Sequence, residues 1–181
     1  MELNRARAIA EEIRGLLEGG YMRCEIVGSV RRLKPFPNDI ELLCIPKFRG
    51  VVDLLNQESS VVDLLDQELK GLIGTHFLDY RHNKNGSIIY GPKNKLLRHV
   101  ESGLGIDIFS TSEECWPVSM VVRTGGKATN QRISMAALNM GYQFHAYGSG
   151  FSTPDGDIVC QSEREVFEAV GLPYLEPWER R

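Results

Sequence analysis

The sequence has few cysteines, and none of them lie close together. Cys24, Cys44, Cys115 and Cys160 form no Cys-x-x-Cys pair, and this spacing excludes a disulfide-framed miniprotein. Reduced thiols and a cytosolic type of location are therefore expected.

Long apolar runs are also missing. No stretch approaches the roughly 20 apolar residues that a membrane-spanning helix needs. The N-terminus, MELNRARAIAEEIRGLLEGG, is charged throughout and has no apolar signal region. The sequence therefore predicts no signal peptide and no membrane partner.

The chain has no excess of positive charge. It carries 21 Lys and Arg against 24 Asp and Glu, a net charge of −3, so contact with nucleic acid would depend on a local patch. Its 181 residues, 42% apolar and 25% charged, are typical of a soluble globular protein with one large domain or two small lobes.

Helical and strand patterns alternate along the chain. Apolar residues at helical spacing predict a helix over residues 2–18, and a capping box at Ser162 and Glu165 begins another over 163–170. Pro154-Asp155-Gly156 predicts a hairpin turn. The other expected elements are strands at 24–27, 39–45 and 104–109, strands and turns over 76–100, and a helix over 130–140. The pattern of expected elements changes after residue 121, which predicts two lobes, 1–121 and 122–181.

Residues 51–68 contain a near-perfect repeat, VVDLLNQE followed by VVDLLDQE. Two copies are too few for a solenoid. The interpretation from sequence is a local duplication that lengthens a helix.

Three carboxylates lie on expected strands among apolar neighbours. Asp39 and Glu41 are two residues apart and share one face of a strand. Asp107 stands between Ile106 and Ile108 on a later strand. Because clustered acids repel one another, they favour a hard divalent cation such as Mg²⁺. A pair of such ions can activate an attacking hydroxyl and stabilise a departing phosphate.

A possible phosphate site precedes these acids. Gly28 has no side chain, so a phosphate can approach the backbone, and the Ser29 hydroxyl can donate a hydrogen bond to it. Arg31 or Arg32 can pair with its oxygens.

Together these motifs resemble the nucleotidyltransferase superfamily, whose signature is Gly-Ser followed by Asp-x-Asp or Asp-x-Glu on the next strand. The segment GSVRRLKPFPNDIELL carries it here. Four further features resemble DNA polymerase family X, the polymerase-beta-like group. They are the doubled arginine, Gly105-Ile106-Asp107-Ile108, the Thr-Gly…Asn segment 124–130, and the tail SEREVFEAVGLPYLEPWERR.

The resemblance implies an α+β fold: a nucleotidyltransferase palm with a mixed sheet and flanking helices, and a small C-terminal α/β thumb-like lobe. It implies that Asp39, Glu41 and Asp107 bind two Mg²⁺ ions, with Mn²⁺ as a substitute, and that Asp107 helps to activate the primer 3′-hydroxyl. The nucleotide-binding residues it implies are Gly28, Ser29 and Arg32 at the phosphates, Thr124, Gly125 and Gly126 at the sugar, and Asn130 at the base.

The implied function is transfer of dNMP from dNTP to a primer 3′-hydroxyl, on primer-template or gapped DNA, by a monomer resembling the minimal palm-plus-thumb form. The compartment would be cytoplasmic, or nucleoid-associated or viral. The expected DNA-facing residues are Arg31, Lys34, Lys84, Lys93, Lys95, Lys127 and Arg132.

Four residues depart from the family pattern. Glu41 replaces an aspartate, Gly126 replaces a serine, and Val122 and Arg123 replace aromatics, which leaves tolerance of ribonucleotides open. The low net charge and the absence of the amino-terminal DNA-clamping region keep two alternatives open: nucleotidyl transfer to an RNA end, protein or small molecule, or a catalytically weak DNA-binding relative.

Overall fold

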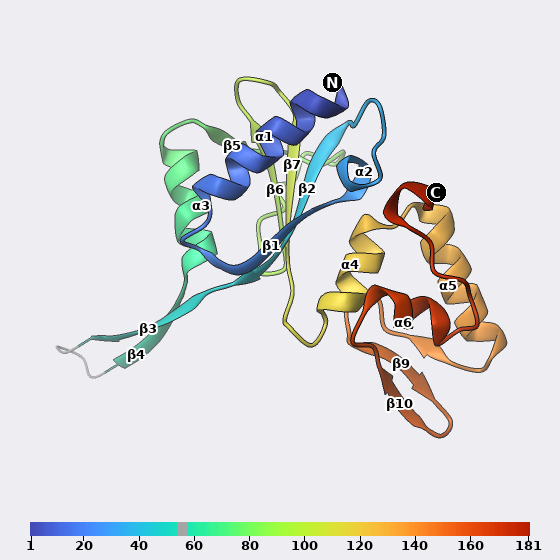
Figure 1. The fold of residues 1–181 in the computed structure, drawn as a ribbon. Helices are drawn as coiled ribbons and strands as arrows, with labels where there is room; N and C mark the ends of the chain where they lie inside the picture. The colour runs from blue at the N-terminus through green and yellow to red at the C-terminus, as the bar shows by residue number, and fades with distance from the viewer. Residues whose placement is uncertain (54–57) are drawn as a thin grey trace.

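The computed structural model describes residues 1–53 and 58–181. It has two lobes, each with its own sheet (Figure 1). The first lobe contains a five-stranded sheet in the order β1-β2-β7-β6-β5. The second contains a three-stranded sheet in the order β10-β9-β8 with helices beside it. The expected α+β class is confirmed.

The first sheet is mixed. Its strands are β1 (Tyr21–Val27), β2 (Asp39–Pro46), β5 (Leu78–Tyr80), β6 (Asn94–His99) and β7 (Gly105–Ser110). Strands β2 and β7 run parallel, and every other neighbouring pair is antiparallel. This pairing brings together two strands that are far apart in the sequence and that carry the three predicted carboxylates.

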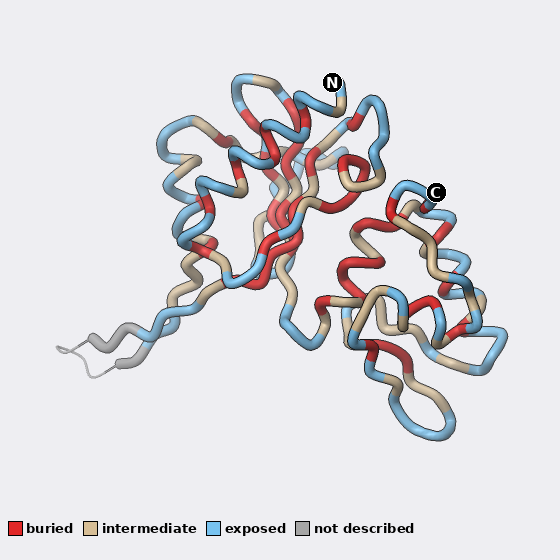
Figure 2. The backbone as a smooth tube through the Cα atoms, in the orientation of Figure 1, coloured by how far each residue is buried: buried red, intermediate tan, exposed pale blue. Residues whose placement is uncertain are grey.

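One face of this sheet is covered by α1 (Leu3–Leu16) and α3 (Leu64–Gly74). Side chains alternate along each strand, so Ile40 and Leu42 of β2 lie on this face with Ile106 and Ile108 of β7, all fully buried. Figure 2 shows the buried backbone gathered along these strands. Each such side chain contributes about 1.5–3 kcal/mol of hydrophobic stabilisation.

The opposite face packs against α4 (Trp116–Thr124). Leu43 and Phe109 lie in a separate buried cluster with Trp116 and Met120 of this helix. Helix α4 therefore connects the sheet to the second lobe. The predicted boundary at residue 121 lies within α4 and stays a prediction.

The second lobe continues with α5 (Lys127–Asn139), β8 (Gln143–Phe144), β9 (Gly150–Thr153), β10 (Gly156–Val159), α6 (Glu163–Glu168) and the short helix η1 (Pro177–Glu179). The predicted hairpin between β9 and β10 is confirmed. So is the cap of α6, where the Ser162 hydroxyl accepts a hydrogen bond from the Glu165 N–H at 3.2 Å.

The interpretation of residues 51–68 as one lengthened helix is wrong for the part that the structure describes. Strands β3 (Phe48–Asp53) and β4 (Glu58–Asp63) form an antiparallel hairpin that extends away from the sheet, and only then does α3 begin (Figure 1). Val61 and Val62 favour a strand because they are β-branched. Asp63 then caps α3 by accepting a hydrogen bond from the Asp66 N–H at 3.1 Å. Residues 54–57 of the repeat lie outside the described residues.

Within the described residues, no helix combines the length and apolar character required to cross a membrane.

Two short elements complete the region around the predicted site. Helix α2 (Gly28–Arg31) follows β1 directly, and the chain then returns to β2 through a loop. No element was expected between the strands at 24–27 and 39–45, so the single turn of helix at Gly28 is new.

Candidate nucleotidyl-transfer site

The three predicted carboxylates lie on the adjacent strands β2 and β7. Glu41 stands directly opposite Asp107, and Asp39 stands opposite Gly105. Because partners in neighbouring strands project to the same face, all three acids lie on the face that packs against α4. The structure thus brings together the acids that the sequence could only place on separate strands.

Burial and mutual repulsion disfavour ionisation of these acids. Burial, with the charges of Asp39 and Asp107 adding to it, raises the pKa of Glu41 to about 7. Burial also raises the pKa of Asp107 to about 6, although the neighbouring Arg81 opposes the shift. An arrangement that keeps two acids partly protonated near neutral pH has too little positive charge nearby.

Arg81 lies beside Asp107, and no local signal in the sequence indicates its role. Its guanidinium forms an ion pair with the Asp107 carboxylate. It also fills the space beside Gly105, where a Cβ would collide with the Arg81 side chain. The sequence shows that residues 81–100 are basic. The contact of Arg81 with Asp107, however, depends on how the segment after β5 packs against β7.

Glu41 faces the Gly-Ser turn. A Cβ on Gly28 would collide with the Glu41 carboxylate, and Gly28 adopts a positive φ of 63° that favours glycine. The Ser29 backbone N–H is close enough to Glu41 to oppose the rise in the pKa of that carboxyl. The turn and the acid cluster are therefore parts of one site.

The donor set fits a divalent cation in its chemistry, since three carboxylates on one face offer the hard oxygens that Mg²⁺ prefers. Across residues 1–53 and 58–181, however, no three acidic, histidine or cysteine side chains are already arranged to hold a metal ion. Asp107 is held by Arg81, and Glu41 lies against Gly28. Binding of a cation would require both carboxylates to turn.

The predicted nucleotide-binding residues have unsatisfied polar atoms. Ser29 Oγ, Arg32 Nε and Asn130 Oδ1 are buried and, in the described part of the chain, have no hydrogen-bond partner. Buried polar groups are nearly always satisfied in folded proteins. Their clustering at residues expected to contact a nucleotide is consistent with a ligand that completes these hydrogen bonds.

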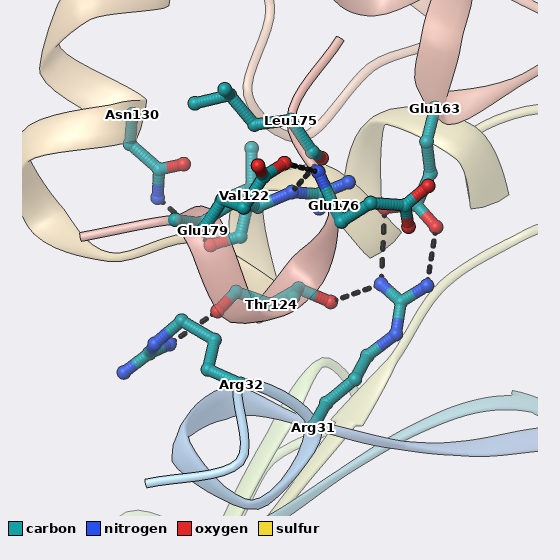
Figure 3. A network of polar contacts seen from close by, with 10 residues as sticks. Arg31, Arg32, Val122, Thr124, Asn130, Glu163, Leu175, Glu176 and Glu179 are labelled. Atoms are coloured by element: carbon teal, nitrogen blue, oxygen red, sulfur yellow. Dashed lines mark hydrogen bonds and ion pairs between the residues drawn. The ribbon is translucent and has the colours of Figure 1, made fainter.

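A polar network joins the two lobes beside this site (Figure 3). Arg31 donates to the Glu163 carboxylate at 2.6 and 3.0 Å and to the Thr124 hydroxyl. Arg32 donates to the Thr124 carbonyl oxygen. Glu163 also pairs with the buried Arg180 at 2.7 Å. Burial alone would raise the pKa of Glu163, but its two arginine partners lower it below the usual range.

The Thr-Gly-Gly segment is shaped by the end of the chain. A Cβ on Gly126 would collide with the backbone of Arg181, and Gly126 adopts a φ of 106°. The Thr129 N–H donates to the Arg181 carbonyl oxygen at 2.7 Å. The departure from serine at position 126 therefore has a steric explanation.

The predicted DNA-facing residues are placed in three ways. Lys34, Lys84, Lys93, Lys127 and Arg132 are exposed. Arg31 is engaged with Glu163 and Thr124 inside the protein. The expectation that Lys95 lies on the surface is wrong, because its side chain is only 2% exposed. Lys95 is opposite Ile108 on β7, so it projects into the core face of the sheet.

Comparison with known proteins shows which fold and which family this chain resembles. Residues 119–181 match the family described as DNA polymerase beta thumb. Two solved structures of Leishmania infantum polymerase beta are similar over the full chain at 19% identity. The ternary P/T complex has a TM-score of 0.75 and covers 100% of this chain and 76% of its own. The ternary gap complex has a TM-score of 0.73 and covers 99% and 70%. These matches confirm the resemblance to family X at the level of the fold and of the thumb lobe.

Proposed function

We propose that this chain is a DNA polymerase, because its fold is similar to that of polymerase beta and residues 119–181 match the DNA polymerase beta thumb family. It would transfer dNMP from a dNTP to a primer 3′-hydroxyl, of the gap-filling type. The observation that carries this proposal is the juxtaposition of Asp39, Glu41 and Asp107 with the Gly28-Ser29 turn. Acids whose pKa is raised, placed next to unpartnered phosphate-binding donors, are typical of a transfer site rather than of a structural ion pair.

Asp39, Glu41 and Asp107 would hold two Mg²⁺ ions, or Mn²⁺ in their place. When bound, such ions supply Lewis-acid stabilisation of the charge that develops on the transferring and departing phosphates. Asp107 would orient the primer 3′-hydroxyl and accept its hydrogen bond at a carboxylate oxygen. The bond from O3′ to the α-phosphorus forms as the bond from the α-phosphorus to pyrophosphate breaks.

Residues of both lobes would bind the nucleotide. Ser29 Oγ and Arg32 Nε, each without a partner among the described residues, would donate to its phosphates, and Gly28 would leave room for their approach. Thr124, Gly125 and Gly126 would lie at the sugar. Asn130 would present its amide to the base; at present its Nδ2 donates to the Val122 carbonyl oxygen at 2.8 Å.

DNA would be held by the exposed cations, Lys34, Lys84, Lys93, Lys127 and Arg132. Because the net charge of the chain is −3, its affinity for DNA should be weak and should fall steeply as the salt concentration rises. DNA binding that does not vary between 50 and about 200 mM salt would contradict this part of the proposal.

A second candidate is nucleotidyl transfer to a different acceptor: an RNA end, a protein or a small molecule. The net negative charge favours it, because a DNA polymerase ordinarily presents an attractive field to the phosphate backbone. It would use the same carboxylates and the same phosphate-binding turn.

The test is extension of a labelled primer on a one-nucleotide-gapped duplex at low salt, with Mg²⁺ or Mn²⁺ and each dNTP separately. Asp107→Asn removes the proposed function, whereas Asp79→Asn is a matched control, because Asp79 is half-exposed and its ion pair is with the equally exposed Arg98. Extension by the complementary nucleotide, lost in Asp107→Asn alone, would support a templated polymerase. Extension by any nucleotide would indicate terminal transfer. Absence of extension with intact metal-dependent dNTP binding would favour the second candidate, and absence of that binding would rule out both.

A further inference from the structure

A cavity of about 780 Å³ lies between the two lobes, apart from the carboxylate cluster. On the α4 face of the sheet its wall begins with Leu43 and Phe109, the next facing pair along β2 and β7 after Glu41 and Asp107. Arg123 and Tyr147 of the second lobe also line it. Lys95, on the opposite face of the sheet, also lines it. We call it the hinge cavity.

Lys95 is a buried cation without a satisfactory partner. Its side chain is 2% exposed, and its Nζ makes no hydrogen bond within the part of the chain that is described. The nearest carboxylate oxygen, on Asp63, is 3.9 Å away, and the Tyr90 ring centroid is 5.7 Å away. An ammonium has three donors, and taking it out of water is costly unless acceptors replace its hydration.

Two hydroxyls in the wall are also unsatisfied. Ser110 Oγ and Tyr90 Oη are buried and hydrogen-bond to no described residue. Asp66 is close enough to Tyr90 to add to the effect of burial in raising the pKa of that phenol, but the two make no hydrogen bond of good geometry. Six of the seven unsatisfied buried atoms in the described chain lie at two places, three at the candidate transfer site and three here; Arg180 Nη2 is the seventh.

The charge and shape of the wall indicate the kind of molecule that would complete it. Four cations line the cavity against two acids, and one of those acids, Asp66, is already paired with Lys70 at 2.8 Å. An anion is therefore favoured. Flat apolar surfaces come from Tyr90 and Tyr147, and the planar Arg123 guanidinium, which covers the Phe109 ring at 3.7 Å from its centroid, adds another flat surface. Such surfaces suit a planar ring.

We propose that the hinge cavity is a second binding site, for an organic phosphate that carries a planar ring and has the size of a nucleoside monophosphate. Lys95 and Ser110 donate to the phosphate, and the ring lies against the aromatic wall. Because both lobes line the cavity, its occupant contacts the palm and the thumb at once. The site is independent of the carboxylates and of the transfer reaction.

The test uses dAMP as the probe, in EDTA, with the affinity measured by isothermal titration calorimetry. Deoxyadenosine and inorganic phosphate are separate arms, each expected to bind at least about tenfold more weakly than dAMP because each retains one half of the interactions. Lys95→Met keeps the unbranched side chain, shorter by one atom, and removes its charge; it should weaken dAMP binding by about tenfold or more. Ser110→Ala should weaken it by several-fold and serves if Lys95→Met does not fold.

Two controls separate this site from others. Lys47→Met removes an ammonium that donates to the Glu18 carbonyl oxygen at 3.4 Å and lies outside the cavity wall; the dAMP affinity should not change. Arg32→Met reports instead on the candidate transfer site, where Arg32 is proposed to contact the phosphates. Loss of binding in Arg32→Met, an unchanged affinity in both Lys95→Met and Ser110→Ala, or no dAMP binding to the wild-type chain would each overturn the proposal.

Discussion

The Arg81 guanidinium pairs with the Asp107 carboxylate and lies in the space that a side chain at position 105 would fill. A cation from the chain beyond β5 thus reaches the acid that lies on β7. The pair is mostly shielded from solvent, with the Asp107 side chain 14% exposed. In this arrangement Arg81 supplies positive charge to Asp107, one of the three clustered acids.

The first prediction concerns that pair. Arg81→Met should lower the free energy of unfolding by about 1–3 kcal/mol at pH 8, because it leaves a buried carboxylate without its partner. The loss should be smaller at pH 5, where Asp107, whose pKa is about 6, is protonated. Urea denaturation in EDTA at the two pH values measures both.

Arg98→Met is the matched control for Arg81→Met. Arg98 pairs with Asp79 at 3.0 Å, but both side chains are 49% exposed, so the change should cost well under about 1 kcal/mol at either pH. A loss for Arg81→Met that is the same at pH 5 and pH 8 would mean that packing, not charge, is what Arg81 contributes.

The second prediction is a pH dependence of stability. Burial and neighbouring acids raise the pKa of Glu41 from 4.5 to about 7. A folded-state pKa above the unfolded value means that the folded chain holds the proton longer, so stability is greatest below pH 4.5 and falls as the pH rises toward 7. The contribution is about 3 kcal/mol. Glu41→Gln should flatten this part of the stability curve in EDTA, and a Glu41→Gln curve that keeps the wild-type slope would contradict the assignment.

The third prediction is that divalent cations reverse this loss. Mg²⁺ or Mn²⁺ should raise the Tm of the wild-type chain more at pH 8 than at pH 5, since binding requires ionised carboxylates. Asp107→Asn should remove most of the shift. Differential scanning fluorimetry with Ca²⁺-free buffers measures it, and Asp79→Asn is the control that should retain it. An equal shift in all three proteins would place the cation elsewhere.

Much of this site could be predicted because its signals are local. Alternation along a strand put Asp39 and Glu41 on one face, and apolar neighbours marked Asp107 as a strand residue. The Gly-Ser turn and the capping box of α6 likewise depend on residues a few positions apart. The strands that carry the acids and the capping box of α6 were confirmed, whereas Gly28 and Ser29 begin the short helix α2.

The parts that could not be predicted depend on contacts between distant segments. Nothing near Arg81 in the sequence indicates that it meets Asp107, because that contact follows from the order of strands in the sheet. Lys95 sits in a basic stretch that suggested a surface, yet its register opposite Ile108 buries it. Each eight-residue copy of the repeat contains both strand-forming valines and helix-forming leucines. The local sequence therefore favours neither structure, and the strands form because β3 pairs with β4.

The fourth prediction concerns the link between the lobes. Glu163 accepts from both Arg31 and Arg180, and the Arg180 side chain is 0% exposed. Glu163→Gln should lower the free energy of unfolding by about 3–5 kcal/mol, because it leaves buried arginines without a countercharge. Glu168→Gln is the control: its pair with Arg164 is long, at 3.9 Å, and exposed, so it should cost less than about 0.5 kcal/mol. Similar losses in the two variants would show that the network contributes no more than a surface ion pair.

The fifth prediction separates two reasons for a glycine. Gly126 and Gly141 both adopt positive φ values, 106° and 73°, but a Cβ would meet the Arg181 backbone at Gly126 and nothing within 4 Å at Gly141. Gly141→Ala should therefore cost only the conformational strain, about 1 kcal/mol. Gly126→Ala should cost more, about 2–4 kcal/mol, since the backbone at Arg181 must also move. Urea denaturation of the two variants compares them directly. If the two alanine substitutions lower the free energy of unfolding by the same amount, the positive φ alone would explain the glycine at position 126. A serine there would then be disfavoured by the backbone conformation and not by contact with Arg181.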